Sequence, residues 1–495
     1  MESSAPAGRV ASAVLDPRRW WALALLCGAF FMVLLDGTIT IVALPSIGAG
    51  LRFSGQGLQW VLSACALTFG GLLLLGGRAA DLLGRRRVFM AGAVFFTTAS
   101  LLCGLAWSPA ALLAARVVQG AGAAIMTPTA LSIISTTFTE GAERNKALGI
   151  WGALGGIGAT TAWLIGGPLV DGPGWEWIFF INIPLGLVAL ALSPLLLRES
   201  RAPTASRSYD PGGALASTGA LVLLVYAVVE APEIGWGDVR TILLVTGSAL
   251  LLAAFALIES RHHAPLVPLH FLRSRTLVGA NAVMLITGTL AVGMPFVLTL
   301  YAQQVLGYSA LEFGVCSVVL ALAVTVGAIV AQAAVLKVGF RPVAATGMAL
   351  MGAGSLLLTQ VSVSGSYFGD IFLGLLVFGP GVGLAFVTAT VAALAGVAEH
   401  ESGLASGLSN TALQIGAALG VAIATTVAVT RSEDYLAANE GANPLVVLNE
   451  GFQSAFLALV VLAGLGMALA LLLLERLRKA PQERLEAVPV PVPDD

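Results

Sequence analysis

The chain has 495 residues, of which 57% are hydrophobic and only 11% are charged, and its mean hydropathy is +0.92. Soluble domains carry about 25% charged residues, so this composition excludes the ordinary soluble globular class. The formal net charge of −2 gives no reason to expect a nucleic-acid partner. The four cysteines lie in apolar runs without a CxxC spacing, so we expect neither a metal site nor a disulfide framework.

Apolar runs recur along the chain from Trp20 to Leu474. A run of about 18 residues or more can cross roughly 30 Å of hydrocarbon as a helix. These runs do not alternate with the period of two that barrel strands show, so the sequence predicts an all-α polytopic membrane protein. We expect fourteen transmembrane helices, over residues 20–44, 58–76, 88–107, 110–136, 147–170, 177–197, 213–231, 241–260, 276–303, 311–336, 342–362, 367–393, 405–430 and 452–475.

The distribution of lysine and arginine predicts the orientation of the chain. With the N-terminus inside, 21 of the 25 basic residues lie on inner segments, three lie on outer segments, and Arg116 lies within a span. Cytoplasmic segments of membrane proteins carry such an excess. We therefore expect a multi-pass protein of the plasma membrane, specifically the bacterial inner membrane, with both termini in the cytoplasm.

Weak internal repeats indicate two parallel halves. QGAGAAIMTPTA at 119–130 resembles FGPGVGLAFVTA at 378–389, and two further pairs, 147–159 with 405–417 and 81–92 with 336–347, follow in register at nearly the same offset. Repeats of this kind are typical of transporters. The predicted organisation is a cytoplasmic tail (1–19), a six-helix bundle (20–197), a linker with two additional transmembrane helices (198–275), a second six-helix bundle (276–475) and a cytoplasmic tail (476–495). We expect a monomer.

A charged turn, GRAADLLGRRR at 77–87, separates the second and third apolar runs. One interpretation is that its arginines only anchor the turn at the inner membrane surface. We prefer a conformational latch, in which Asp81 accepts hydrogen bonds from Arg85 or from helix N-termini of the opposite half when the inside is shut. The predicted latch residues are Gly77, Arg78, Asp81, Gly84, Arg85 and Arg86.

Two charged residues lie inside predicted spans of the first half. Asp36 precedes Pro45 by nine residues, and Arg116 lies six residues into its span, about 13 Å and 9 Å from the outer ends. A buried charge is costly unless it is paired or faces a cavity, so each is the other's expected partner. Arginine keeps its proton, so we expect Asp36 to bind and release the coupling proton while Arg116 modulates its affinity. The alternative is a fixed ion pair that only holds the two helices together.

The substrate pocket is harder to locate from sequence. The polar and aromatic residues expected at mid-depth are Thr68, Met126, Trp163, Phe378, Phe386 and Gln414. No second deep acid occurs in the second half, which favours neutral or singly charged lipophilic substrates over dications.

Several motifs together resemble the major facilitator superfamily, and specifically its fourteen-span drug/proton antiporters. GRAADLLGRRR matches the turn after the second span, ARVVQGAGAAIMTP (115–128) resembles the fourth-span motif, and LLDGTITIVALP (34–45) and WEWIFFINIPLG (175–186) resemble those of the first and sixth spans. The chain departs from the pattern where Ala162–Trp163 replace the usual Gly-Pro of the fifth-span antiporter motif and where Leu413 replaces an arginine.

The resemblance implies a proton-coupled efflux transporter that exports small lipophilic molecules, such as drugs or antibiotics, by alternating access. The proton gradient would supply the energy without a cofactor, and protons, substrate and membrane lipids would be the partners. The sequence leaves open an exporter or uniporter of a specific metabolite or lipid without proton antiport, and a non-transporting membrane receptor. Neither an HExxH motif nor a P-loop is present, so we do not expect an enzyme.

Overall fold

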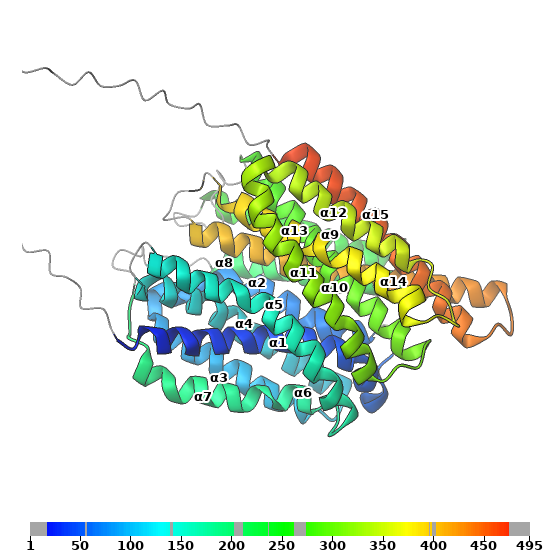
Figure 1. The fold of residues 1–495 in the computed structure, drawn as a ribbon, viewed down its shortest axis with the longest axis horizontal. Coiled ribbons are helices and arrows are strands. Elements are labelled where there is room, and N and C mark those ends of the chain that lie inside the picture. The colour runs from blue at the N-terminus through cyan, green and yellow to red at the C-terminus, as the bar shows by residue number, and fades with distance from the viewer. Residues whose placement is uncertain are drawn as a thin grey trace, which may run out of the picture.

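The computed structural model describes residues 17–54, 57–138, 142–201, 211–235, 237–261, 274–395, 397 and 402–474, and these residues are helical without any strand (Figure 1). The helices in chain order are α1 (Arg19–Leu51), η1 (Gly57–Gln59), α2 (Trp60–Leu83), α3 (Arg85–Gly104), α4 (Pro109–Thr137), α5 (Ala142–Asp171), α6 (Trp177–Phe180), α7 (Asn182–Leu196), α8 (Pro211–Ile234), α9 (Val239–Arg261), α10 (Arg275–Gln304), α11 (Ala310–Val338), α12 (Phe340–Leu358), η3 (Tyr367–Ile371), α13 (Phe372–Leu394), α14 (Ser402–Ala438) and α15 (Pro444–Leu473).

Within the described residues, eleven helical segments are long and apolar enough to cross a membrane. The α6–α7 pair forms one of these segments, and η3 with α13 forms another. The described parts of α2, α5 and α8 do not meet the same criterion of length and hydropathy. The protein is therefore an all-helical, multi-pass membrane protein, and the number fourteen stays a prediction.

Three helices extend well beyond the apolar runs that predicted them, and one of these, α15, begins at Pro444 rather than at residue 452. α1 continues through Pro45 to Leu51, although residue 44 was the expected end, and α14 continues to Ala438 rather than 430. Hydropathy marks where a helix meets water, whereas backbone hydrogen bonding decides where it stops. Asp36 therefore lies near the middle of α1, about 22 Å from its last residue.

The helices pack as two sets that meet along two seams. α1–α7 pack mainly on one another, as do α10–α15, and the sets meet where α2 contacts α14 and where α5 contacts α11. α8 and α9 pack on each other, and α8 also contacts both α2 and α14. At that seam the Thr218 hydroxyl of α8 donates a hydrogen bond to the Gly71 carbonyl of α2 at 3.0 Å.

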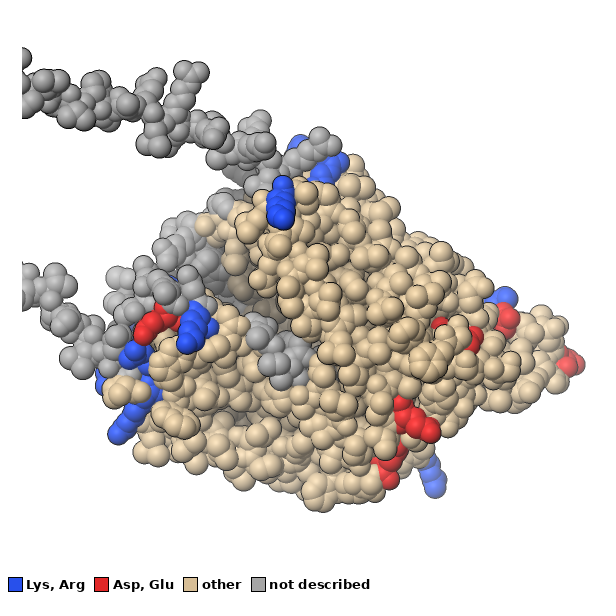
Figure 2. All heavy atoms as spheres, viewed as in Figure 1, with Lys and Arg blue, Asp and Glu red and all other residues tan. Residues whose placement is uncertain are grey.

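The two ends of the molecule differ in charge. α1 begins and α15 finishes at the same end of the structure (Figure 1). Lysine and arginine side chains gather at this end, on the left in Figure 2, whereas most of the visible aspartate and glutamate side chains lie toward the opposite end.

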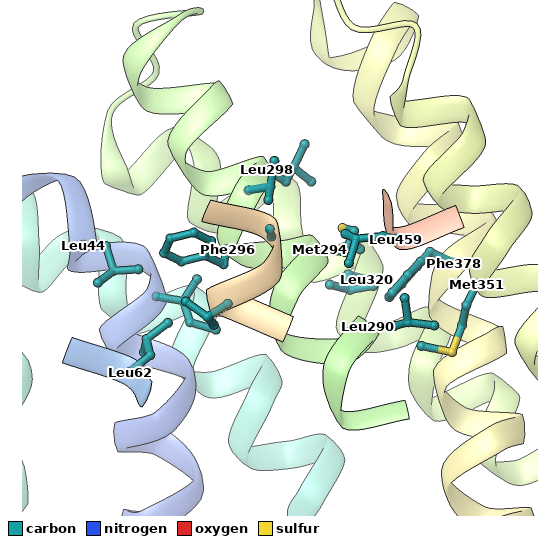
Figure 3. Packing of buried hydrophobic residues seen from close by; sticks show 14 of the residues in the cluster. Leu44, Leu62, Leu290, Met294, Phe296, Leu298, Leu320, Met351, Phe378 and Leu459 are labelled. Atoms are coloured by element: carbon teal, nitrogen blue, oxygen red, sulfur yellow. The ribbon is translucent and has the colours of Figure 1, made fainter. Parts of the chain in front are cut away.

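Apolar side chains fill the space between the helices. Leu44 of α1 and Leu62 of α2 belong to the same buried cluster as Phe296 of α10 and Phe378 of α13 (Figure 3). α10 and α14 approach so closely that a Cβ atom on Gly416 would lie 1.9 Å from the Leu285 carbonyl oxygen. Small residues permit such close contact between membrane helices, so this glycine holds two helices of the same set together.

Candidate functional site

Asp36 of α1 and Arg116 of α4 form a buried ion pair. Their exposed fractions are 2% and 1%, and Arg116 Nη1 lies 2.5 Å from Asp36 Oδ2. The start of α4 fixes the arginine, because Pro109 occupies the first helical position and the Ser108 hydroxyl accepts from the Ala111 N–H at 3.2 Å. The structure thus brings together the two charges that the sequence singled out.

Two carboxamides complete the polar network around this pair. Gln119 accepts from Arg116 Nη1 at 2.7 Å, and its Nε2 donates to Asp36 Oδ1 at 2.8 Å and to the Ser100 hydroxyl at 2.9 Å. Asn182 Nδ2 donates to the same Asp36 oxygen at 3.0 Å. Each oxygen of the carboxylate therefore accepts at least one hydrogen bond, as a buried ionised group requires.

The sequence analysis missed Gln119, Asn182 and Ser100. Gln119 follows Arg116 by three residues and therefore lies on the same helix face, which was a usable signal. Asn182 gave no such signal, because it lies on a different predicted span, 146 residues from Asp36 along the chain.

The remaining contacts of Arg116 hold its guanidinium in place. Nε donates to the Val61 carbonyl oxygen of α2 at 2.8 Å, and the Phe179 ring lies 5.8 Å from Cζ. The network links α1, α2, α3, α4, α6 and α7 around one carboxylate. Chemically it places a group that can gain or lose a proton beside a cation that cannot.

A cavity of about 350 Å³ opens beside the ion pair. Asp36 and Arg116 form part of its wall, and of the six predicted pocket residues Trp163, Phe378 and Gln414 line it. The other three lie elsewhere: the Thr68 hydroxyl bonds to the Ala64 carbonyl, Met126 is buried in a separate core cluster, and Phe386 is 40% exposed. Depth in the membrane could be estimated from the sequence, but the face of each helix that turns to the cavity could not.

The two sets of helices form chemically different walls of this cavity. α1–α5 contribute the ion pair and Thr38. Among the described residues, the wall from α10–α14 consists of apolar side chains, including Val292, Pro295, Leu320 and Phe378, with Gln414 as its single polar side chain.

The two sets of helices contact each other at the end away from the first residue of α1. Asp171, the last residue of α5, accepts from the backbone N–H groups of Ala310 and Leu311 at 3.3 and 2.8 Å, at the start of α11. A little deeper, the Trp163 ring packs edge-on against Phe313 of α11, with 5.7 Å between the ring centroids. Trp163, at the departure from the antiporter motif, thus joins the α5–α11 seam and lines the cavity.

A second hydrogen bond crosses between the sets at this end. Gln303 of α10 donates from Nε2 to the Val42 carbonyl oxygen of α1 at 3.0 Å. Together with the Asp171 contacts, it joins two helix pairs of the two sets, α1 with α10 and α5 with α11.

The charged turn between α2 and α3 contacts the segment after α7. The N–H of Arg85 donates to the Ser200 carbonyl at 3.0 Å, and the N–H of Arg86 donates to Glu199 Oε1 at 3.2 Å. Gly84 has a φ of 108°, and a Cβ atom there would lie 2.6 Å from Glu199. These partners precede α8 in the chain, and the sequence analysis did not single out Glu199. The expected contacts of Asp81 with Arg85 or with helix N-termini of the opposite half stay a prediction.

The remaining predicted latch residues are Gly77, Arg78 and Asp81. A Cβ atom on Gly77 would meet only Pro128, at 3.6 Å, and Arg78 lies in the last turns of α2. The side chain of Asp81 lies outside the described residues.

The sequence matches a protein-family profile and is similar to known resistance and export proteins. The profile described as Major Facilitator Superfamily matches residues 26–421. A puromycin resistance protein from Streptomyces alboniger is 39% identical over 478 residues, covering 95% of this chain and 93% of that protein. A cephamycin export protein from Amycolatopsis lactamdurans is 38% identical over 409 residues, covering 82% and 84%.

The fold also matches solved structures. A bacterial homologue of the human lysosomal transporter Spinster, crystallised in an inward-facing and unoccupied conformation, superposes with a TM-score of 0.64 at 17% identity, covering 92% of this chain and 97% of that one. At this identity the likeness concerns the fold alone.

Proposed function

Because the chain belongs to the major facilitator superfamily, a family of transporters rather than enzymes, we propose that it exports small lipophilic molecules from the cytoplasm in exchange for protons. Its relatives include a puromycin resistance protein and a cephamycin export protein, and this supports antibiotics as the substrate class. The proton gradient is the energy source, and no cofactor takes part.

In this proposal α1–α7 and α10–α15 are two six-helix halves, and α8 and α9 are an inserted pair. The basic end of the molecule faces the cytoplasm with both termini, and the protein acts as a monomer. The contacts of Asp171 and of Gln303 between the sets then keep the outer side closed. Export requires these contacts to break while the charged turn at 77–87 closes the inner side, which is alternating access.

The proton step uses the buried pair. The ionised Asp36 holds Arg116 by charge, whereas a protonated Asp36 holds it only by hydrogen bonds, so proton binding weakens the link between α1 and α4. A proton bound from outside and released inside would then bias the two states in opposite directions. The observation that carries the proposal is the 2.5 Å ion pair in the wall of a cavity that both sets line.

The test uses inside-out vesicles that contain the protein and have an acidic lumen. A panel of lipophilic cations and neutral antibiotics, with puromycin among them, is added while a dye reports the luminal pH. We expect substrate-dependent proton efflux for the wild type and none for Asp36→Asn. The matched control Asp434→Asn removes an exposed carboxylate and should behave like the wild type. Proton-driven export that survives in Asp36→Asn would refute the coupling role of Asp36 and favour another coupling group.

A further inference from the structure

The cavity wall from α10–α14 contains one polar side chain, and the ion-pair network does not use it. Gln414 lies in the wall formed by α10–α14, and its amide makes no hydrogen bond to any residue that the structure describes. Gln119, the same residue type on the other side, is bound to Arg116, Asp36 and Ser100 at once. Gln119 is therefore bound within the ion-pair network, whereas Gln414 lines the cavity without such hydrogen bonds.

The stem of Gln414 is held where α14 meets α2. A Cβ atom on Gly70 would lie 2.8 Å from the Gln414 Cβ, so the two backbones meet closely at this point. One turn earlier, the Thr411 hydroxyl donates to the Gly70 carbonyl at 3.1 Å. The Cβ atom of Gln414 is therefore fixed beside α2, and the amide extends from this fixed point.

The chemistry of this amide differs from that of the ion pair. A carboxamide offers two donors and one acceptor side by side and carries no charge. A ligand that bonded to Asp36 or Arg116 would have to replace contacts that are already made, whereas Gln414 has its donors and acceptor available. Apolar and aromatic side chains such as Val292, Leu320 and Phe378 surround it.

We propose that Gln414 determines substrate specificity by binding an uncharged group that has a donor and an acceptor next to each other, such as an amide on a lipophilic body. The inference rests on the proposed export function and narrows its substrate class. The cavity volume of about 350 Å³ lies within the range of sites that hold drug-sized molecules. A lipophilic cation without hydrogen-bonding groups would use the same apolar wall but not Gln414.

The experiment measures direct binding to the purified full chain in lipid nanodiscs, so it does not depend on proton coupling. The probes are chloramphenicol, which is uncharged and has an amide and hydroxyl groups, and tetraphenylphosphonium, a cation that has no hydrogen-bonding group. Gln414→Leu keeps the volume of the stem and removes the amide. We expect chloramphenicol to bind about tenfold more weakly to this variant, as the loss of one or two neutral hydrogen bonds predicts, while the Kd for tetraphenylphosphonium stays within about twofold.

Two further variants make the result specific. Gln360→Leu makes the same chemical change at an exposed position outside the cavity and should leave both Kd values unchanged. Gln414→Asn keeps an amide on a shorter stem and should bind chloramphenicol with intermediate strength.

The outcomes separate this inference from the function on which it rests. Equal affinity of wild type and Gln414→Leu for chloramphenicol, or equal loss of both probes, overturns the role of Gln414. If such a protein still shows substrate-dependent proton efflux in vesicles, the export function stands without it. A wild type that binds neither probe and moves no protons overturns both.

Discussion

The two walls of the cavity come from corresponding parts of a repeated sequence, yet they have taken on different chemistry. At the repeat offset of 259, Arg116 corresponds to Leu375 and Gln119 corresponds to Phe378. In α4 these positions hold the ion pair, whereas in α13 Leu375 is fully buried and Phe378 faces the cavity. The charged side chains of the cavity therefore lie on one side, which separates a wall that holds an ion pair from a largely apolar one.

The largest predicted effect tests whether the charged wall depends on complete pairing. Arg116→Leu leaves the Asp36 carboxylate buried without its cation and should lower the free energy of unfolding by about 3–5 kcal/mol. The double variant Asp36→Asn/Arg116→Leu should recover much of that stability but no coupled export. Thermal unfolding in detergent checks the first expectation and the vesicle assay checks the second. A single Arg116→Leu variant as stable as the wild type would mean that the ion pair does not stabilise the charged wall.

The next prediction compares two corresponding glycines, Gly416 of α14 and Gly158 of α5. A Cβ atom on Gly416 would meet the backbone oxygen of Leu285 at 1.9 Å, whereas one on Gly158 would meet the side chain of Leu34 at 3.0 Å. The Leu285 backbone must shift substantially in the first case, whereas in the second the Leu34 Cβ atom must move by only a few tenths of an ångström. We expect Gly416→Ala to cost about 2 kcal/mol of stability and Gly158→Ala less than about 1 kcal/mol. Equal melting temperatures for the two variants would show that the halves do not differ in packing at this pair.

A smaller effect is expected at the α5–α11 seam, where the two sets meet. Asp171→Ala removes the acceptor for the first N–H groups of α11, which should cost about 1 kcal/mol. In the proposed transport cycle, this loss destabilises only the state that is closed on the outer side. The population of the outward-open form should rise about fivefold. Labelling of a cysteine introduced at Thr38, in the cavity wall, by an impermeant reagent from outside measures this change. The same labelling rate in wild type and variant would contradict a closing role for Asp171.

The smallest effect is predicted for the turn between α2 and α3. Glu199→Gln keeps an acceptor for the Arg86 N–H but removes the charge that lies 3.9 and 3.7 Å from the Arg86 and Arg87 Nε atoms. These groups are partly exposed, so the loss of stabilisation should be below about 1 kcal/mol. The labelling rate of the cysteine introduced at Thr38 should therefore change less than it does in Asp171→Ala. A larger effect than that of Asp171→Ala would place the main closing contact at the turn.

Much of this fold could be predicted from the sequence, because apolar runs in a membrane protein have few alternatives to a helix. Asp36 and Arg116 could also be paired in advance, since two isolated buried charges at similar depth need each other. The hydrogen-bond partners of this pair and of the charged turn were harder to predict. Asn182 reaches the carboxylate because α7 packs beside α1, and Glu199 meets the turn because α7 returns beside α3. Contacts of that kind depend on how helices rotate and pack, which a hydropathy pattern does not record.

Because of the position of α8, the two seams between the helix sets differ in how well they are covered on the side that faces the bilayer. Along the α2–α14 seam, α8 lies against both helices and Thr218 bonds to the α2 backbone. Lipid tails that approach this side therefore meet a helix of the linker before they reach the junction. The α5–α11 seam has no corresponding cover among the described contacts. A compound dissolved in the membrane thus encounters a covered flank on one side of the protein and a bare one on the other.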